Sequence, residues 1–305
     1  MKKKIVAILF ALLILYCLLF PGRMSLAVTD GLTLWYRSIL PTLLPFSIFS
    51  NIVIRTGVYD RFFRRMSPAF RILYPVRSPL IYPLLAGFLF GFPLGSKICA
   101  ELCRMGKITP KEAEIISSVS NNFGPGFLHN YLYLRVLDGQ IHLPVIIASC
   151  YLPPLLLGRI PLCRYYRKNT DFPYEKPASG SQINMEILDA GIMNGFKTMI
   201  RLAGYILLSS LLADAVRNLP LSNDILRTVC IGAMEITNGL QQIEKTGFEP
   251  AMKGILAVGI VNFGGISGLC QTYSMLNSTG VRIRNYVLFK LMCSLCGTLI
   301  IFILL

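Results

Sequence analysis

The sequence predicts an all-α membrane protein, organised as an inverted repeat with two re-entrant helical hairpins and two broken transmembrane helices. Of its 305 residues, 54% are hydrophobic and only 15% are charged, which is typical of polytopic membrane proteins. Glycine, proline and asparagine interrupt several of the apolar runs. Similar interruptions occur in the same order in both halves of the chain, and this order predicts the repeat.

The N-terminal segment, residues 1–26, is predicted to be a signal-anchor or transmembrane helix. Three lysines, residues 2–4, precede an uninterrupted apolar run over residues 5–20. Ser25-Leu26-Ala27 has the small residues of a signal-peptide cleavage site, so removal of this segment is an alternative. Because lysines favour the cytoplasmic side, the next segment is expected to start outside.

The first repeat is predicted over residues 27–162. An apolar helix over 27–56, kinked at its prolines, leads to a loop that its arginines place in the cytoplasm: Arg55, Arg61, Arg64, Arg65, Arg71 and Arg77. The next apolar run, 79–105, is interrupted at 91–95. Each arm of about 12 residues spans only about 18 Å of a hydrocarbon core about 30 Å thick. We therefore expect a re-entrant hairpin that enters from the cytoplasm and returns to it.

The first broken helix follows on the same side of the membrane. Thr109 is predicted to be its N-cap and Pro110 its first residue. The helix is expected to cross outward, to break at 121–126 and to reach an outer turn at Asp138-Gly139. A helix over 142–162 then returns inward.

The second half is predicted to repeat this order in the opposite orientation. A cytoplasmic linker over 163–185 precedes the second repeat, residues 186–305. Its expected elements are a helix over 187–216, a hairpin over 227–245 entering from outside, a helix from 250 broken near 262–265, and a last helix over 286–305. Residues 122–124, Asn-Phe-Gly, recur as 262–264. Oppositely oriented repeats are found in many secondary transporters.

The interruptions predict a binding site near the membrane midplane. Lipid cannot satisfy free peptide groups, so irregular backbone must lie inside the protein or beside a water-filled cavity. Half-helix N-termini favour an anionic group. The expected substrate-binding residues lie at or near the interruptions, although the polar ones could instead satisfy the freed backbone: Gly91, Gly95, Ser96, Lys97, Asn121, Asn122, Gly124, Glu235, Thr237, Asn238, Gly239, Asn262, Gly264, Gly265, Ser267 and Gln271.

Two charged residues stand out because ionisable groups within a membrane are costly and commonly functional. Lys97 is expected to pair with a substrate carboxylate or, in the empty site, with Glu235. Lys97 could alternatively extend to the cytoplasmic surface. Glu235 could form a structural ion pair with Lys97 or Arg201, couple protons, or bind substrate. Trp35-Tyr36-Arg37 is interpreted as an interfacial anchor.

Other classes of protein are disfavoured by the residue pattern. The net charge of +15 is attributed to loops that orient helices, since no basic stretch is interleaved with stacking aromatic residues, and no nucleic-acid partner is expected. The nine cysteines have spacings that indicate neither a disulfide framework nor a metal site. No enzyme motif was found, so we expect neither an enzymatic activity nor a cofactor.

Two sets of motifs carry a family resemblance. "GFPLGSK", "GKITPKEAE" and "NNFGPGF" in the first half, with "EITNG" and "NFGGISG" in the second, resemble the two Gate (nucleoside-recognition) domains of sporulation integral membrane proteins of the YlbJ/SpoVV type. The resemblance extends from about residue 28 to the end of the chain. It implies a core similar to that of concentrative nucleoside transporters, and passage of dipicolinate across the outer forespore membrane during endospore formation.

From these features we expect a multi-pass protein of the cell membrane or the outer forespore membrane that transports a small organic anion by alternating access. Dipicolinate is the first candidate by resemblance. A nucleoside-type transporter and a non-transporting assembly factor of sporulation are the alternatives. The expected partners are the anionic substrate and the lipid bilayer, with a second copy of the chain or other sporulation membrane proteins considered as well.

Overall fold

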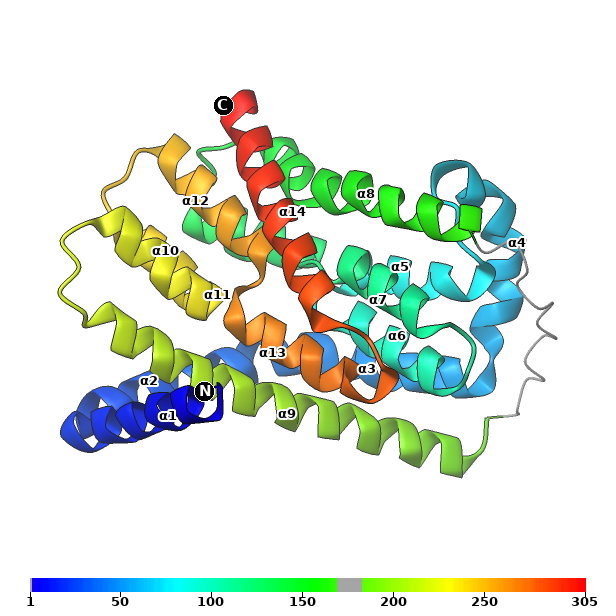
Figure 1. The fold of residues 1–305 in the computed structure, drawn as a ribbon, viewed down its shortest axis with the longest axis horizontal. Helices are drawn as coiled ribbons and strands as arrows, with labels where there is room; N and C mark the ends of the chain where they lie inside the picture. The colour runs from blue at the N-terminus through cyan, green and yellow to red at the C-terminus, as the bar shows by residue number, and fades with distance from the viewer. Residues whose placement is uncertain (1, 169–182) are drawn as a thin grey trace.

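A computed structural model of the chain describes residues 2–168 and 183–305, and within these ranges it contains helices and no strand (Figure 1). Four helical segments are long and apolar enough to cross a membrane: Leu143–Lys168, Met185–Arg217, Pro250–Thr279 and Ile283–Leu304. A bent pair near the N-terminus could form a fifth. Most of the predicted linker, 163–185, lies outside the described residues.

The N-terminal region consists of two helices. Helix α1 (Lys2–Leu19) and α2 (Pro21–Leu34) meet at Phe20, where the chain bends by 109°. Proline suits the first helical position because its missing N–H would have no partner there. Beyond α2, the π-helical turn η1 (Trp35–Ile39) leads into α3 (Leu40–Thr56). The apolar stretch predicted over 27–56 is therefore helical throughout, with Pro45 inside α3.

The prediction of a loop in the arginine-rich segment is wrong, because this segment contains helix α4 (Val58–Leu73). Gly57 ends α3 with a left-handed φ of 66°, and α4 starts directly after it. Arg64 donates a hydrogen bond of 2.8 Å to Asp60 one turn earlier, while Phe63 packs against the core. Basic and apolar residues alternate with a helical period, so one face of α4 packs inward and the other stays polar.

The predicted first hairpin is present as two helices, α5 (Ser78–Phe90) and α6 (Leu94–Arg104), which pack against each other. Helix α7 (Pro110–Ser120) starts with the predicted cap: Glu112 N donates to Thr109 Oγ1, and Thr109 N donates to Glu112 Oε2. Arg77 also donates two hydrogen bonds, of 2.7 and 2.8 Å, to the Glu112 carboxylate. These contacts hold the starts of α5 and α7 together.

The remaining elements follow the predicted order. They are η2 (Phe127–Val136), α8 (Leu143–Lys168), α9 (Met185–Arg217), α10 (Asp224–Met234), α11 (Ile236–Lys245), α12 (Pro250–Phe263), α13 (Gly265–Leu276), η3 (Asn277–Thr279) and α14 (Ile283–Leu304). Short non-helical segments separate α5 from α6, α7 from η2, α10 from α11 and α12 from α13. We call residues 91–93, 121–124, 235 and 264 the four breaks.

The two hairpins lie at opposite ends of the molecule. Figure 1 shows α5 and α6 at the end that holds α4, and α10 and α11 at the other end. One hydrophobic cluster joins α5, α6 and α7, and a second joins η2, α8, α11 and α12. Helices α2, α3 and α9 pack together beside both hairpins. The four breaks therefore lie in the middle of the molecule.

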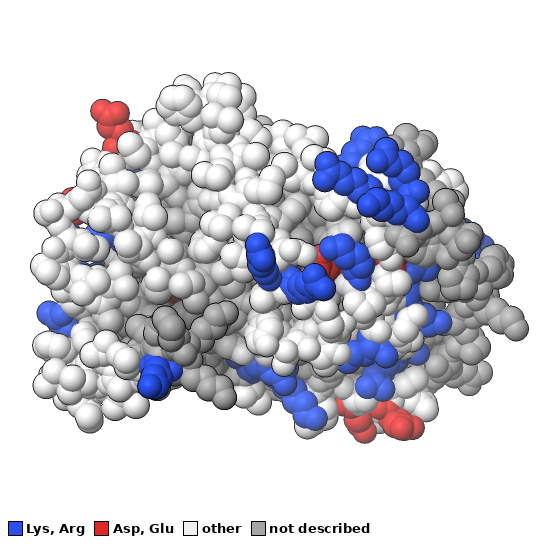
Figure 2. Space-filling view, in the orientation of Figure 1, with Lys and Arg blue, Asp and Glu red and all other residues white. Residues whose placement is uncertain are grey.

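Basic side chains gather mainly toward the end of the visible face at which α8 ends (Figure 2). This is the end that the distribution of lysine and arginine predicts to face the cytoplasm. Both free ends of the α5–α6 hairpin lie there too. The orientation in the membrane stays a prediction.

Candidate binding site

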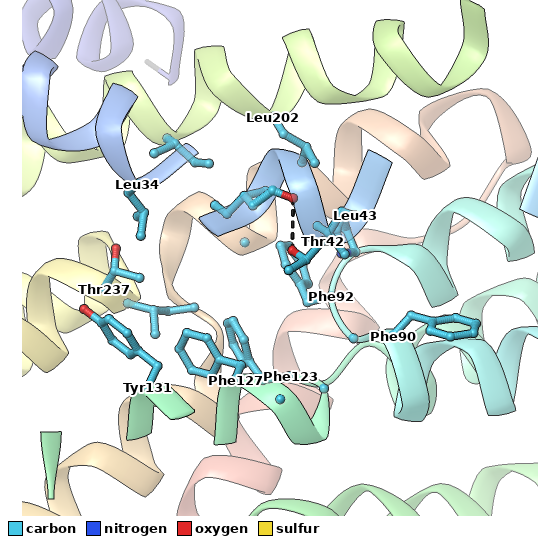
Figure 3. Close-up of a pocket in the computed structure, with 18 of the residues that line it drawn as sticks. Leu34, Thr42, Leu43, Phe90, Phe92, Phe123, Phe127, Tyr131, Leu202 and Thr237 are labelled. Atoms are coloured by element: carbon cyan, nitrogen blue, oxygen red, sulfur yellow. Dashed lines mark hydrogen bonds between the residues drawn. The ribbon is translucent and has the colours of Figure 1, made fainter. Parts of the chain in front are cut away.

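A cavity of about 740 Å³ lies between the breaks and the α3–α9 pair (Figure 3). The first three breaks contribute residues to its wall, and the fourth contributes through the first turns of α13. Helix α3 lines it with Thr42, Leu43 and Phe46, and α9 lines it with Leu202 and Ile206. Segments that are far apart in the sequence thus meet at one cavity.

Two glycines bring the first two breaks into backbone contact. Gly91 has a left-handed φ of 86°, and a Cβ atom placed there would lie 2.5 Å from the backbone nitrogen of Gly124. A Cβ atom on Gly124 would in turn lie 3.2 Å from the Leu89 carbonyl oxygen. Only glycine permits both this φ and this approach without strain. The hairpin tip and the broken helix therefore form one continuous wall of the cavity.

Aromatic rings form much of the apolar lining. Phe123 and Phe127 have ring centroids 4.5 Å apart, and Tyr131 continues the row 5.1 Å from Phe127. Phe92, from the hairpin, lies 6.0 Å from Phe123. Figure 3 shows these rings on one side of the cavity, with Leu34 and Leu202 opposite. Flat apolar walls of this kind suit a planar ring of a ligand.

Among the described residues, one basic and one acidic side chain line the cavity. Arg37, in the π-helical turn η1, is exposed, and the described part of the chain provides no hydrogen-bond or ion-pair partner for it. Glu235 is buried and accepts hydrogen bonds from the backbone N–H of Asn238 at 2.8 Å and from Thr237 Oγ1. Glu235 therefore caps α11, whereas Arg37 is free to meet an anion.

Three of the helices that begin at the breaks, α6, η2 and α13, have no side-chain cap. Their N-terminal N–H groups and the positive ends of their dipoles add to the charge of Arg37. The carboxylate of Glu235 neutralises the corresponding end of α11. The wall of the cavity is thus electropositive where α6 and η2 begin. Near α11 it carries the Glu235 carboxylate and is not electropositive.

Six of the sixteen predicted site residues line the cavity: Gly91, Gly124, Glu235, Thr237, Ser267 and Gln271. Gln271 Nε2 donates a hydrogen bond of 3.0 Å to Ser267 Oγ, one helical turn earlier. The other ten do not line it: Gly95, Ser96, Lys97, Asn121, Asn122, Asn238, Gly239, Asn262, Gly264 and Gly265. The cavity thus includes residues at or near all the predicted interruptions, and a role of any of them in substrate binding stays a prediction.

Several of those ten residues support the breaks. A Cβ atom on Gly95 would lie 2.5 Å from Ser120 Oγ, and one on Gly239 would lie 2.3 Å from the Gly232 Cα, so both allow close helix packing. Asn262 Nδ2 donates to the Ser149 carbonyl oxygen on α8 at 3.0 Å. These residues hold the walls of the cavity in place without facing it.

The expected pairing of Lys97 with Glu235 is wrong in this structure, and so is a pairing of Glu235 with Arg201. Lys97 Nζ donates instead to Ser47 Oγ on α3 and is only 5% exposed, which also excludes its extension to the surface. Lys97 and Glu101 are four residues apart in α6, so they lie on the same face of this helix, one turn from each other. Glu101 accepts hydrogen bonds from the α3 side chain Asn51 at 2.7 Å and the α9 side chain Asn194 at 2.9 Å.

Two basic residues were missed by the sequence analysis. Arg37 was interpreted as part of an interfacial anchor with Trp35, whose Nε1 donates to the Met199 carbonyl oxygen at 2.9 Å. Lys290 is the second, and it is buried beside the break in α7. A single lysine inside the apolar stretch of α14 was a usable signal, because such charges are rare in membrane spans.

Comparisons with known proteins give one relative. No protein-family model matches the chain, and no solved structure matches it. The chain is similar to the sporulation integral membrane protein YlbJ of Bacillus subtilis (strain 168), with 23% identity over 304 residues that cover 87% of this chain and 74% of that protein. Together with the apolar helices, this similarity shows that the chain lies in a membrane.

The chain is a multi-pass integral membrane protein. The resemblance to sporulation integral membrane proteins that the motifs indicated is confirmed by this relative. The division into two Gate domains stays a prediction.

Proposed function

We propose that this protein transports a small organic anion across a membrane by alternating access, and that dipicolinate is the leading substrate. The observation that best supports this proposal is that three breaks and the start of α13 meet at the same cavity. Irregular backbone within a membrane protein is tolerated where it lines a cavity, and secondary transporters bind substrates at such interrupted helices.

The packing supports an inverted repeat as part of this proposal. If α5–α8 and α10–α14 are equivalent units, four contacts between the units form two matching pairs. Helix α6 packs against α13 as α11 packs against η2, and α8 packs against α12 as α14 packs against α7. Exchange of the two units thus preserves these contacts. A core similar to that of concentrative nucleoside transporters has such an arrangement.

The inverted repeat makes a prediction about sidedness. Asp138→Cys and Ser222→Cys, introduced separately after the exposed Cys163 and Cys270 are changed to serine, are expected to react with a membrane-impermeant maleimide added to intact cells. Cysteine at Arg65 on α4 is the control and should react only after the membrane is opened. Labelling of the Arg65 variant in intact cells, or protection of both outer variants, would contradict the proposed orientation.

The lining of the cavity supports an aromatic anion as substrate. Dipicolinate is a planar pyridine ring with two carboxylates, so its ring matches the aromatic walls and its charge matches Arg37. The relative is named as a sporulation protein, and sporulation is the process we propose for this chain, at the outer forespore membrane or the cell membrane.

A nucleoside is the second candidate substrate, because one part of the cavity offers neutral and acidic hydrogen-bonding groups. Glu235, Thr237 and Gln271 lie there, and they could accept or donate to the hydroxyl groups of a sugar. Under either substrate we propose that the protein acts as a carrier and catalyses no reaction.

Alternating access requires that the cavity open to each side in turn. The cavity lies between two groups of helices, the α2, α3 and α9 group and the group that contains the hairpins. We propose that these groups move relative to each other. Two hydrogen bonds join the groups, one between Lys97 and Ser47 and one between Glu101 and Asn51. We propose that these four side chains change partners during the movement.

The test is uptake of radiolabelled dipicolinate by liposomes that contain the purified protein. Uptake above that of protein-free liposomes, with inhibition by unlabelled dipicolinate and little inhibition by uridine, is expected. Inhibition by uridine together with uptake of labelled uridine would favour the nucleoside candidate. If the folded protein moves neither compound, the carrier proposal fails and a sporulation assembly factor becomes the better explanation.

A further inference from the structure

Lys290 is a buried cation in the last helix, α14. It lies seven residues after the start of this helix, about 10 Å along its axis, and only 2% of its surface is exposed. The span that contains it is strongly apolar. A charge in such a position is costly to desolvate, so its partners indicate what it does.

The ammonium group of Lys290 is held by oxygen atoms of the break that follows α7. Its Nζ donates to the Asn121 carbonyl oxygen at 2.8 Å and to Asn122 Oδ1 at 3.2 Å. Asn121 lies at the C-terminal end of α7, where the last carbonyl groups are unpaired and the helix dipole is negative. A cation is therefore favoured at this point.

The same side chain also reaches the break between α12 and α13. A Cβ atom placed on Gly264 would lie 3.8 Å from Lys290 Cε. Gly264 has a left-handed φ of 87° and ends α12. The aliphatic part of Lys290 thus passes one break while its ammonium group is bonded to another, and both belong to the broken helices.

No carboxylate balances this charge within the described residues, since none of the ion pairs there involves Lys290. Around it, Asn121 Nδ2 donates to Thr272 Oγ1 at 2.8 Å and to the Tyr286 hydroxyl at 2.6 Å. Neutral oxygens from unwound backbone and amide side chains are the ligands that transporters offer to a bound alkali cation at half-helix C-termini.

We propose that the Lys290 ammonium is the resident cation of this site and takes the place of a bound metal ion. It is a positioning residue that keeps the two broken helices in register. The chain therefore needs no alkali cation at the break after α7. Removal of the ammonium without filling its space creates a vacant site for a small cation. This inference concerns the folded protein alone and does not depend on the identity of the substrate.

The test compares thermal unfolding of the full-length protein in lipid nanodiscs in choline, sodium and ethylammonium chloride at equal ionic strength. Wild type is expected to unfold at the same temperature in choline and sodium. Lys290→Ala is expected to unfold about 5 °C lower in choline, with at least half of the loss recovered in sodium or ethylammonium. Lys290→Met, which fills the space with an apolar chain, should show the loss without recovery. Lys197→Ala, on an exposed position of α9, is the control.

Three results would overturn the proposal. The first is stabilisation of wild type by sodium over choline, because the site would then hold a metal ion besides Lys290. The second is an unchanged unfolding temperature of Lys290→Ala in choline. The third is a loss that neither cation recovers. If the Lys290 variants do not fold, the wild-type comparison alone still decides between a resident ammonium and a bound metal ion.

Discussion

Uptake of dipicolinate is expected to fall roughly 10- to 100-fold when Arg37 is replaced by glutamine. Arg37 is the only lysine or arginine among the described residues that line the cavity, and none of those residues neutralises it. Glutamine keeps a hydrogen-bond donor but removes the charge and the planar fork that binds a carboxylate through two bonds. A charge-assisted hydrogen bond contributes about 1.5–3 kcal/mol, and this range corresponds to the expected decrease.

The measurement is the initial rate of uptake at several dipicolinate concentrations by liposomes with equal amounts of protein. Arg37→Lys should retain part of the activity because it keeps the charge. Arg65→Gln, an exposed change on α4, controls for the loss of one positive charge from the protein. Uptake by Arg37→Gln at the wild-type rate would remove Arg37 from the substrate site, and equal losses in both glutamine variants would indicate a general charge effect.

Gly91→Ala is expected to lower the free energy of unfolding by about 2–5 kcal/mol. An alanine at a left-handed φ costs about 1–2 kcal/mol, and the new methyl group would lie 2.5 Å from the Gly124 nitrogen. Relief of that overlap requires the hairpin tip to move away from the α7 break, which adds about 1–3 kcal/mol. Since both segments line the cavity, the uptake rate should fall as well.

Gly126→Ala is the matched control for this change. Gly126 has a helical φ of −62°, and a Cβ atom there would meet no atom within 4 Å. Its replacement should change the free energy of unfolding by less than about 1 kcal/mol, and the expected direction is a gain because alanine lowers the entropy of the unfolded chain. Denaturation of both variants in the same detergent gives the comparison. Equal free energies of unfolding for Gly91→Ala and Gly126→Ala would show that the backbone segments at Gly91 and Gly124 are farther apart than the structure describes.

The breaks could be predicted because their signals are local. Glycine, proline and asparagine within an apolar run interrupt a helix wherever the rest of the protein lies, and residues 91–95, 121–126, 235–239 and 262–265 were placed on that basis. The cap at Thr109 is equally local, since it depends on Pro110 and Glu112 within one turn. In contrast, α4 was missed because the charges of a half-exposed helix look like those of a loop.

Which side chains face the cavity could not be predicted in the same way. Lys97 was chosen over Arg37 because it follows a break directly, yet Lys97 bonds to Ser47 on α3 and Arg37 enters the cavity from η1. Glu235 caps its own helix and does not pair with Lys97. Each of these outcomes depends on how far a helix is rotated about its axis when it packs.

By itself, the sequence determined that the chain is an all-helical membrane protein, where its helices are interrupted and which motifs form caps. Composition and neighbouring residues decide these features, because helix formation and insertion into lipid act over a few turns of one segment. Only the tertiary structure decided that the breaks meet at one cavity, that Arg37 rather than Lys97 lines it, and that Lys290 on α14 reaches a break about 170 residues earlier. These contacts join distant segments, and their geometry is set by packing between helices, which no local pattern encodes.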